Sequence, residues 1–550
     1  MSDLPDHRIR HAWTADGADA AHLPPKAVRR LTERIGPVRA GAGIASPPEP
    51  AVPESLLPSA AGAELAEVLG AEWMLTDRVA RLGRCGGLSY PDLLSRRLPG
   101  ELPVPDAVLL PGDPCQVQRV LEVCARHDLA VVPFGGGTSV VGGVTAARGG
   151  KRAVVVLDLQ RLNRLVSVDP VSRLAVFQAG VRGPEAERML AAHGLTLGHV
   201  PQSFERATIG GFAATRSAGQ ASAGYGRFED MVQGVRLATP RGEWRLGVAP
   251  ASAAGPDLRQ LAVGSEGTLG VLTEVTVRVR PLPVVERFEG FVLDGWERGT
   301  AAVRELAQAG ALADVTRLSD VDEMEMSLTL KGGWQTALLR RYLRARGVAE
   351  PCLLVLGWHG AGRRELARRR TRTVRMLRAA GAVRLGRAAG EAWRAGRFAG
   401  PRQRDALLDL GLCVETLETA TRWSVLGRLR TQVRAALVDS LRAPGREPVV
   451  MCHVSHAYET GASLYFTVLL PRDDADPFGQ WAEAKRAACE AIAGSGNPLG
   501  TITHHHAVGA DHAPYLAGEI GEIGISVLAA AKQAVDPTGI LNPGKLITGR

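Results

Sequence analysis

The chain has 550 residues, of which 45% are hydrophobic and 22% are charged, and its formal net charge is +9. This length predicts two to four packed units. The charge does not predict nucleic-acid binding, because almost all the cations are arginines spread along the chain without a zinc-finger or RNA-binding motif. No run of about 18 apolar residues predicts a membrane-spanning helix, and the first residues lack the apolar core of a secretory signal. We therefore expect a cytoplasmic protein, whose seven scattered cysteines are reduced thiols.

Residues 1–100 predict a helical region that contains an extended strap. The stretch over residues 41–55 is rich in proline, glycine and alanine, which is typical of a linker or a strap lying along the surface. Residues 101–284 change to alternating short strands and helices, a pattern of α/β or α+β units. In this part LAVVPF, AVVVLDL and RLAVFQAG predict strands, and Pro281 and Pro283 end the last strand of the region.

Three loops rich in glycine and hydroxyl groups stand out in the same region. PFGGGTSVVGG follows a predicted strand, where bare backbone N–H groups can approach a phosphate. It matches neither a Walker loop nor GxGxxG, so by itself it predicts a tight structural turn equally well. ATIGGFAATRSAG and GSEGTLG add two more such loops, and together the three indicate a site for a pyrophosphate and its attached chain.

These loops resemble the FAD-binding domain of the vanillyl-alcohol oxidase and p-cresol methylhydroxylase flavoproteins, and the ending DPTGILNPGKL is similar to the closing segment of that superfamily. The resemblance implies an α+β fold: a PCMH-type FAD-binding domain of two α+β subdomains, plus a cap domain with an antiparallel sheet flanked by helices. It implies FAD as cofactor. We expect FAD to be non-covalent, because the first loop offers no His, Cys or Tyr as a tether, although His199 and Tyr225 lie near the second loop. The resemblance assigns the following residues to FAD: Pro133, Phe134, Gly135, Gly136, Gly137, Thr138, Ser139, Gln202, Ser203, Thr208, Gly210, Gly211, Thr215, Arg216, Ser217, Glu266, Gly267, Thr268, Leu269, Gly270, Val271 and Leu272.

Residues 285–505 predict the cap, or substrate, domain, and residues 506–550 predict a segment that returns to the FAD domain. CLLVLGW and SLYFTVLL predict strands of the cap, and the arginine-rich segment from Gly362 to Arg397 predicts a solvated amphipathic helix. Many members of the superfamily carry an HxGDGNxH-type segment associated with a metal. Here His453 and His456 are present without GDGN, which weakens a metal-linked hydroxy-acid dehydrogenase, and we assign no metal site.

Within the superfamily the chain resembles alkyldihydroxyacetonephosphate synthase most, as a bacterial relative. The resemblance rests on Tyr465 in SLYFTV, the triplet His504–His506 in THHHAVG, Arg404 ahead of the ETLET segment, and Arg317 in ADVTRLSD. HAWTADG and TDR near the N-terminus agree with it. Gln202 departs from it, because the eukaryotic enzymes tend to carry an acid there.

The resemblance implies a transferase of ether-lipid synthesis. The acyl group of acyl-dihydroxyacetonephosphate is replaced by a long-chain alcohol, with a covalent adduct at the flavin N5 and no net redox change. It implies that Tyr465, His504, His505, His506 and Arg317 are catalytic and that Arg404 binds substrate. The residue types suit these roles, because histidine titrates near neutral pH, a phenol can exchange a proton and arginine matches a phosphate.

Alternatives remain open at this point. The triplet could hold a metal or form a surface loop instead of moving protons, although adjacent side chains of an extended segment point alternately and three of them do not face one metal. The chain as a whole could be an FAD-linked oxidase or dehydrogenase of a 2-hydroxy acid or small alcohol, or a flavin-binding protein without catalysis.

The substrate is expected to be lipid-like or another small molecule, which raises the question of membrane contact. The segment Trp334–Gly347 predicts an interfacial helix, with Trp334, Leu338, Leu339, Tyr342 and Leu343 on an apolar face beside arginines, a pattern suited to anionic headgroups. A helix packed on the cap with solvated arginines is the equal alternative. Peripheral contact at the inner membrane surface and a homodimer are thus left as expectations, and no nucleic-acid partner is expected.

Overall fold

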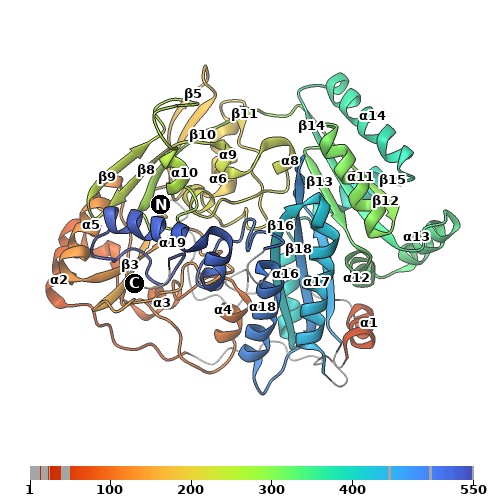
Figure 1. The fold of residues 1–550 in the computed structure, drawn as a ribbon. Helices are drawn as coiled ribbons and strands as arrows, with labels where there is room; N and C mark the ends of the chain where they lie inside the picture. Colours follow the sequence, from red (N-terminus) through yellow and green to blue (C-terminus); the bar gives the residue numbers. More distant parts are fainter. Residues whose placement is uncertain are drawn as a thin grey trace.

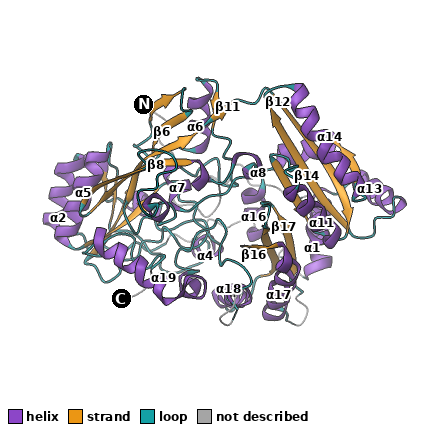
Figure 2. Ribbon diagram, turned by 45° about the horizontal axis from the view of Figure 1, so that its top comes forward, coloured by secondary structure: helices purple, strands orange, loops and turns teal. Residues whose placement is uncertain are grey.

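The computed structural model describes residues 13, 23, 25–36, 38, 50–443, 447–494 and 498–547. Most of the predicted strap over residues 41–55 and most of HAWTADG lie outside the described residues. The described part forms two groups of strands with loops between them (Figure 2). We call residues 50–284 the first region and residues 285–494 the cap.

The first region contains two larger sheets. One has the order β1-β2-β4-β3, in which β2, β3 and β4 are parallel, and the other is antiparallel with the order β5-β6-β10-β8-β9. A small ladder joins β7 to β11. The strands are β1 (Met74–Leu75), β2 (Ala107–Leu109), β3 (Leu129–Phe134), β4 (Ala153–Asp158), β5 (Leu165–Asp169), β6 (Leu174–Gln178), β7 (Leu195–Thr196), β8 (Val232–Thr239), β9 (Gly242–Leu246), β10 (Val271–Arg278) and β11 (Arg280–Pro281).

Helices pack on these sheets where the sequence supplies an N-terminal capping residue and an apolar face. α5 begins at Pro114, because the Asp113 carboxylate accepts a hydrogen bond from the Gln116 N–H, and it ends where Asp128 takes a left-handed conformation with φ 56°. Its buried face is Val117, Val120, Leu121, Val123 and Cys124. The helices up to the cap are α1 (Pro25–Ile35), α2 (Ser59–Leu69), α3 (Arg78–Leu82), α4 (Tyr90–Ser95), α5 (Pro114–His127), α6 (Gly183–Ala191), α7 (Ile209–Ala214), α8 (Ser222–Tyr225), α9 (Phe228–Met231) and α10 (Leu258–Ala262).

The cap is built on a seven-stranded antiparallel sheet with the order β15-β12-β14-β13-β17-β18-β16. Its strands are β12 (Val285–Asp294), β13 (Val315–Ser319), β14 (Pro351–Gly360), β15 (Val383–Gly386), β16 (Leu412–Arg422), β17 (Val449–Val454) and β18 (Gly461–Pro471). Flanking it are α11 (Trp296–Gln308), α12 (Val321–Lys331), α13 (Trp334–Ala345), α14 (Arg363–Ala379), α15 (Arg387–Gly396), α16 (Gly400–Asp409), α17 (Trp423–Leu441) and α18 (Pro477–Ala493). The predicted α+β fold with an antiparallel cap sheet is confirmed.

After the cap the chain returns to the first region, where α19 (Leu516–Val535) lies across it (Figure 1). The return ends in a backbone bridge to β3: the Val131 N–H donates to the Ile540 carbonyl and the Asn542 N–H donates to the Val131 carbonyl, both at 2.8 Å. Ile540 and Leu541 are fully buried in the core of the first region. The end of the chain is therefore part of that core.

Two sequence predictions about the cap were wrong in detail. The arginine-rich segment from Gly362 to Arg397 is not one helix: it contains α14, the edge strand β15 and α15, because Gly381 and Gly386 take positive φ values of 79° and 82°. The apolar face predicted for α13 is split between two sides of that helix. Leu343 is buried and Leu339 packs with it against the cap, whereas Trp334, Leu338 and Tyr342 are 71%, 54% and 44% exposed.

None of the helices in the described part of the chain combines the length and the apolar character that a bilayer crossing needs.

Candidate active site

The first glycine loop follows β3 and presents a row of unused backbone donors. No described residue accepts a hydrogen bond from the N–H groups of residues 135–139. A side chain on Gly136 would collide with the Arg206 carbonyl, so this loop packs directly against the second loop. Five consecutive free N–H groups in a glycine turn form the kind of concavity that binds an anion such as a pyrophosphate.

The third loop also packs against the end of β3. A side chain on Gly267, which has φ 75°, would stand 2.8 Å from the Pro133 ring. The Glu266 carboxylate of this loop accepts the N–H groups of Val508 and Gly509, both at 2.8 Å. Burial raises the pKa of Glu266 to about 7. The loop thus ties the segment that follows the histidine triplet to the glycine loops.

Other predicted FAD residues have partners inside the protein. The Thr208 hydroxyl caps α7 by accepting from the Gly211 N–H, and the Thr215 hydroxyl donates to the Gly211 carbonyl. The Arg216 guanidinium donates to the carbonyls of Gln260 and Val263. Three more predicted residues form hydrogen bonds within the protein: Ser217 bonds His199, the Thr268 hydroxyl donates to the Ser265 carbonyl, and the Ser203 carbonyl accepts backbone N–H groups. Leu269, Val271 and Leu272 are buried, and Gln202 is exposed. Gly210 packs on Ala179, and Gly270 has φ 152°. In the second and third loops the backbone is also engaged, for example where the N–H groups of Gly210 and Thr268 donate to the carbonyls of Ala179 and Ser265. The run of free backbone donors is therefore a feature of the first loop.

The histidine triplet is wrapped around one buried carboxylate, Glu418 of β16. The backbone N–H groups of His504, His505 and His506 donate to Glu418 at 2.7, 3.0 and 2.8 Å, and the Thr503 hydroxyl donates to it at 2.6 Å. Burial alone would raise the pKa of Glu418, but the neighbouring histidines, His505 above all, outweigh burial and hold that pKa well below its usual range. An ionised, buried Glu418 therefore sets the shape of this turn.

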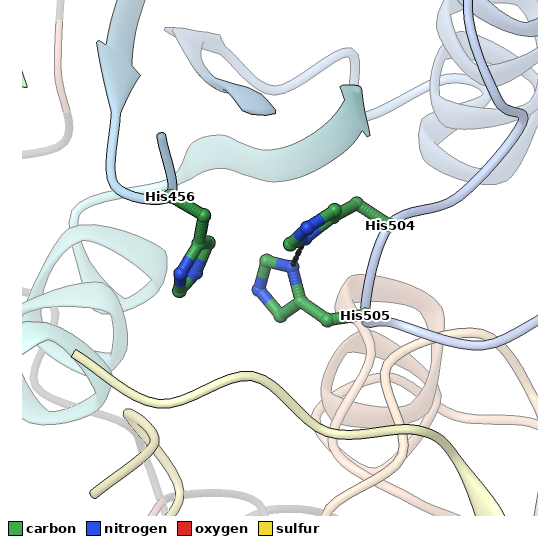
Figure 3. Close-up of side chains that lie close together, drawn as sticks. All are labelled: His456, His504 and His505. Carbon is green, nitrogen blue, oxygen red and sulfur yellow. Dashed lines mark hydrogen bonds between the residues drawn. The ribbon is translucent and has the colours of Figure 1, made fainter. Parts of the chain in front are cut away.

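Because the triplet bends, its side chains do not alternate as in an extended strand, which was the premise of the sequence argument. The Nδ1 atoms of His504 and His505 are 3.0 Å apart, and the His505 Nδ1 is 3.5 Å from the Glu418 carboxylate. The His456 ring, from the loop after β17, stacks on that of His504 at 5.0 Å, so three imidazoles converge (Figure 3). His506 turns toward Tyr465, with ring centroids 5.4 Å apart, and burial lowers the pKa of His506 to about 3.

The three converging imidazoles are also the one group in the described part of the chain with the spacing of metal ligands. Ligand atoms of His456, His504 and His505 lie within 4.8 Å of one another. Both nitrogens of His504 are already engaged, however: Nε2 bonds the Tyr458 hydroxyl at 2.6 Å and Nδ1 bonds His505. A metal would have to break at least one of these bonds, so the arrangement favours proton transfer over metal binding.

Tyr465 stands in the centre of a row across the cap sheet. It lies opposite Glu418 on one side and opposite His453 on the other, and its ring stacks on that of His453 with centroids 4.7 Å apart and 14° between planes. Burial raises the pKa of the Tyr465 phenol. Tyr465 therefore shares one face of the sheet with the residue that shapes the triplet.

Arg317 on β13 is anchored beside this row. Its guanidinium donates to Glu323 at 2.7 Å and lies 3.0 Å from the His453 Nδ1, which is itself 3.0 Å from Glu323. Burial would raise the pKa of Glu323, but Arg317 and His453 outweigh it and lower that pKa. Arg317 thus reaches the site through His453, which stacks on Tyr465.

Arg404 on α16 approaches the same place from the other side. Its guanidinium donates to the Leu88 carbonyl at 2.8 Å, and its buried Nε has no hydrogen-bond partner among the described residues. Burial lowers the pKa of Arg404, and the Tyr465 phenol is within its electrostatic reach. An unpaired donor of this kind is available for an anionic group.

Sequence reasoning assigns no role to three residues of this site: Glu418, Tyr458 and His456, the last of which enters only as part of the segment that lacks GDGN. A glutamate inside the apolar strand LCVETLETA was a signal for Glu418, because buried carboxylates need partners. His456 and Tyr458 come from a loop whose position depends on how β17 and β18 pair, and no local pattern gives that pairing.

Comparison with known proteins agrees with this geometry. The family model described as "FAD binding domain" matches residues 105–246, and the model described as "FAD linked oxidases, C-terminal domain" matches residues 282–546. The chain is 31% identical to alkyldihydroxyacetonephosphate synthase of Dictyostelium discoideum over 480 residues, which cover 86% of this chain and 78% of that protein.

Among solved structures, an alkyldihydroxyacetonephosphate synthase superposes with a TM-score of 0.80 at 26% identity, covering 96% of this chain and 92% of that chain. p-Cresol methylhydroxylase with bound substrate, at 15% identity and a TM-score of 0.64 over 88% of this chain and 96% of that chain, shares the fold. The chain therefore belongs to the alkyldihydroxyacetonephosphate synthase family of FAD-dependent enzymes.

Proposed function

We propose that this enzyme replaces the acyl group of acyl-dihydroxyacetonephosphate with a long-chain alcohol, without net oxidation or reduction of substrate. The observation that carries the proposal is the position of the histidine triplet. Glu418 ties the triplet to the cap sheet, and Glu266 ties the next residues, Val508 and Gly509, to the glycine loops. An exchange of this kind needs a base, an anion-binding arginine and a cofactor loop within one site, and these residues supply all three.

The residues present fit FAD. The free N–H groups of residues 135–139 suit its pyrophosphate, and the remaining predicted loop residues would line the rest of the molecule. FAD, when bound, would supply the reactive flavin ring for the exchange. We expect it to be held without a covalent bond, so that acid precipitation of the protein releases all the yellow colour, and colour retained in the pellet would contradict this.

His505 is the best placed of the three histidines to take a proton from the substrate carbon next to the carbonyl. It is less buried than His504, with its side chain 17% exposed, and its Nδ1 lies 3.5 Å from the Glu418 carboxylate. Its Nε2 would receive the proton while its Nδ1 faces His504.

The remaining predicted residues have complementary roles. Tyr465 would exchange a proton with the substrate oxygen, and Arg317, acting through His453, would hold the Tyr465 ring in place. Arg404, whose Nε is unpaired, would bind the phosphate of the substrate. These roles are proposals, as is the division of the chain at residues 100, 284 and 505.

The direct test is product analysis with one variant. The wild-type enzyme is expected to convert acyl-dihydroxyacetonephosphate and hexadecanol into the ether and one equivalent of free fatty acid, measured by mass spectrometry. His505→Ala should lower turnover by roughly 100-fold or more, on the scale of general acid–base catalysis, with normal flavin content. Loss of activity on chelation and its recovery with added zinc would favour a metal role for the triplet instead.

One observation keeps a second function in view. The cap matches a family of FAD linked oxidases, so an oxidase or dehydrogenase of a 2-hydroxy acid or small alcohol is the alternative. It requires net reduction of the flavin by substrate, which the proposed exchange does not.

A further inference from the structure

A chain of short contacts leads from His505 to the protein surface. The His505 Nδ1 lies 3.0 Å from the His504 Nδ1, and the His504 Nε2 lies 2.6 Å from the Tyr458 hydroxyl. Solvent exposure of the residues increases along this chain, from 5% for His504 to 36% for Tyr458. The chain therefore joins a buried imidazole to a side chain that water can reach.

The outer end of the chain is held in place by its backbone. Tyr458 lies between β17 and β18, where its N–H donates to the Gly461 carbonyl at 2.8 Å and its carbonyl accepts the indole N–H of Trp423 at 3.0 Å. Its ring lies 5.8 Å from that of His504. These backbone contacts hold Tyr458 in place, and the Arg227 guanidinium lies beside its hydroxyl.

The surroundings of His504 prevent it from keeping a proton. The Arg227 guanidinium donates to the His504 carbonyl at 2.7 Å, and the His456 ring covers one side of the His504 ring. A positive guanidinium and a buried setting both disfavour a charged imidazole. His504 can therefore pass a proton on without trapping it.

We propose that Tyr458 and His504 form a proton relay that connects His505 to solvent. When His505 takes a proton from substrate at Nε2, its Nδ1 proton moves to the His504 Nδ1. The Nε2 proton of His504 then moves to the Tyr458 oxygen, and the Tyr458 hydroxyl proton moves to water. Each group receives one proton and gives one, and no electron is transferred. Movement of the protons in the opposite direction restores the starting state.

This inference rests on the proposed function, because a base that removes a carbon-bound proton has to exchange it. It assigns to Tyr458 a role that acts through the histidines, without contact with substrate. The matching test removes only the hydroxyl, in Tyr458→Phe, and uses Tyr515→Phe as a control that removes a tyrosine hydroxyl outside the chain.

The first measurement is the rate at which acyl-dihydroxyacetonephosphate incorporates deuterium from D₂O, followed by mass spectrometry. Tyr458→Phe is expected to slow it on the order of 10-fold, less than loss of the base itself, with unchanged KM. Added imidazole should restore the rate in proportion to its concentration, because a small donor can replace the missing hydroxyl. A wild-type rate in Tyr458→Phe, or a slow rate that imidazole does not restore, would overturn the relay.

A second measurement does not depend on the substrate. In ¹⁵N-histidine-labelled holoenzyme, low-field proton NMR should show a hydrogen-bonded imidazole N–H that Tyr458→Phe broadens or shifts and Tyr515→Phe does not. If wild type neither makes ether nor incorporates deuterium, the proposed function fails, and this signal then decides the relay alone. An imidazole signal that is the same in wild type and Tyr458→Phe would contradict the relay.

Discussion

At the scale of single residues, Glu418 fixes the turn that carries the three histidines. One carboxylate accepts three consecutive backbone N–H groups and a hydroxyl, and an unpaired buried donor costs about 1–3 kcal/mol. Its position opposite Tyr465 follows from the pairing of β16 with β18. The geometry of the triplet is therefore decided by a residue 86 positions earlier in the chain than His504.

Glu418→Gln tests this directly, since it keeps the shape of the side chain but turns an N–H₂ group toward backbone donors. We expect the melting temperature to fall by several degrees and turnover to fall by about 100-fold, with flavin content near normal. Glu519→Gln is the matched control, because Glu519 accepts from Thr501 and Ile502 of the same segment without touching the histidines. Equal effects of the two substitutions on turnover would show that Glu418 has no special role.

At the scale of single elements, we propose that α13 contacts the membrane. Trp334, Leu338 and Tyr342 point outward, Arg340 is paired with Glu325 at 2.7 Å, and Arg341, Arg344 and Arg346 are exposed. An exposed aromatic and aliphatic face beside arginines suits an anionic bilayer surface, from which a lipid substrate would be drawn.

Vesicle co-sedimentation at low salt measures this contact. Leu338→Asp is expected to reduce pelleting with anionic vesicles several-fold, and raising the salt concentration should weaken the pelleting of wild type. Val171→Asp, at an apolar residue that is 93% exposed in the first region, is the control and should pellet like wild type. If Leu338→Asp pellets like wild type, α13 is not the contact.

The glycine loops and the cap helices also show what sequence can and cannot predict at this scale. The first loop was predictable because it directly follows the apolar strand β3, and the family resemblance rested on short, contiguous motifs. The side of α13 that packs on the cap was not predictable. Helical periodicity places Leu339 and Trp334 on one broad face, and only the packing of the cap buries Leu339 while leaving Trp334 exposed. Likewise the row Glu418, Tyr465 and His453 depends on strand register, which a sequence pattern leaves free.

At the scale of the whole molecule, buried neutral histidines predict sensitivity to acid. Burial lowers the pKa values of His199, His506 and His512 to about 3, below the value of about 6.5 in an unfolded chain. Their contribution to the free energy of unfolding is present above pH 6.5 and is lost as the pH falls toward 3, by about 1.4 kcal/mol per pH unit for each histidine. Buried carboxyl groups oppose this loss: burial raises the pKa values of Glu266 and Asp511 to about 7 and about 6.

Thermal unfolding of the holoenzyme between pH 8 and pH 5 checks the sign. The melting temperature is expected to be nearly constant above pH 7 and to fall increasingly below pH 6.5. A melting temperature that rises steadily toward pH 5 would mean that the buried carboxyl groups dominate instead.

The central claim is that the site performs an exchange without net redox, and anaerobic flavin absorbance tests it most directly. The oxidised enzyme is mixed without oxygen with acyl-dihydroxyacetonephosphate and a long-chain alcohol, while absorbance near 450 nm and ether formation are followed together. Many turnovers of ether with no lasting loss of flavin absorbance are the result that we predict. Stoichiometric, lasting bleaching by either compound, or by a 2-hydroxy acid, without ether formation would contradict the account and establish an oxidoreductase.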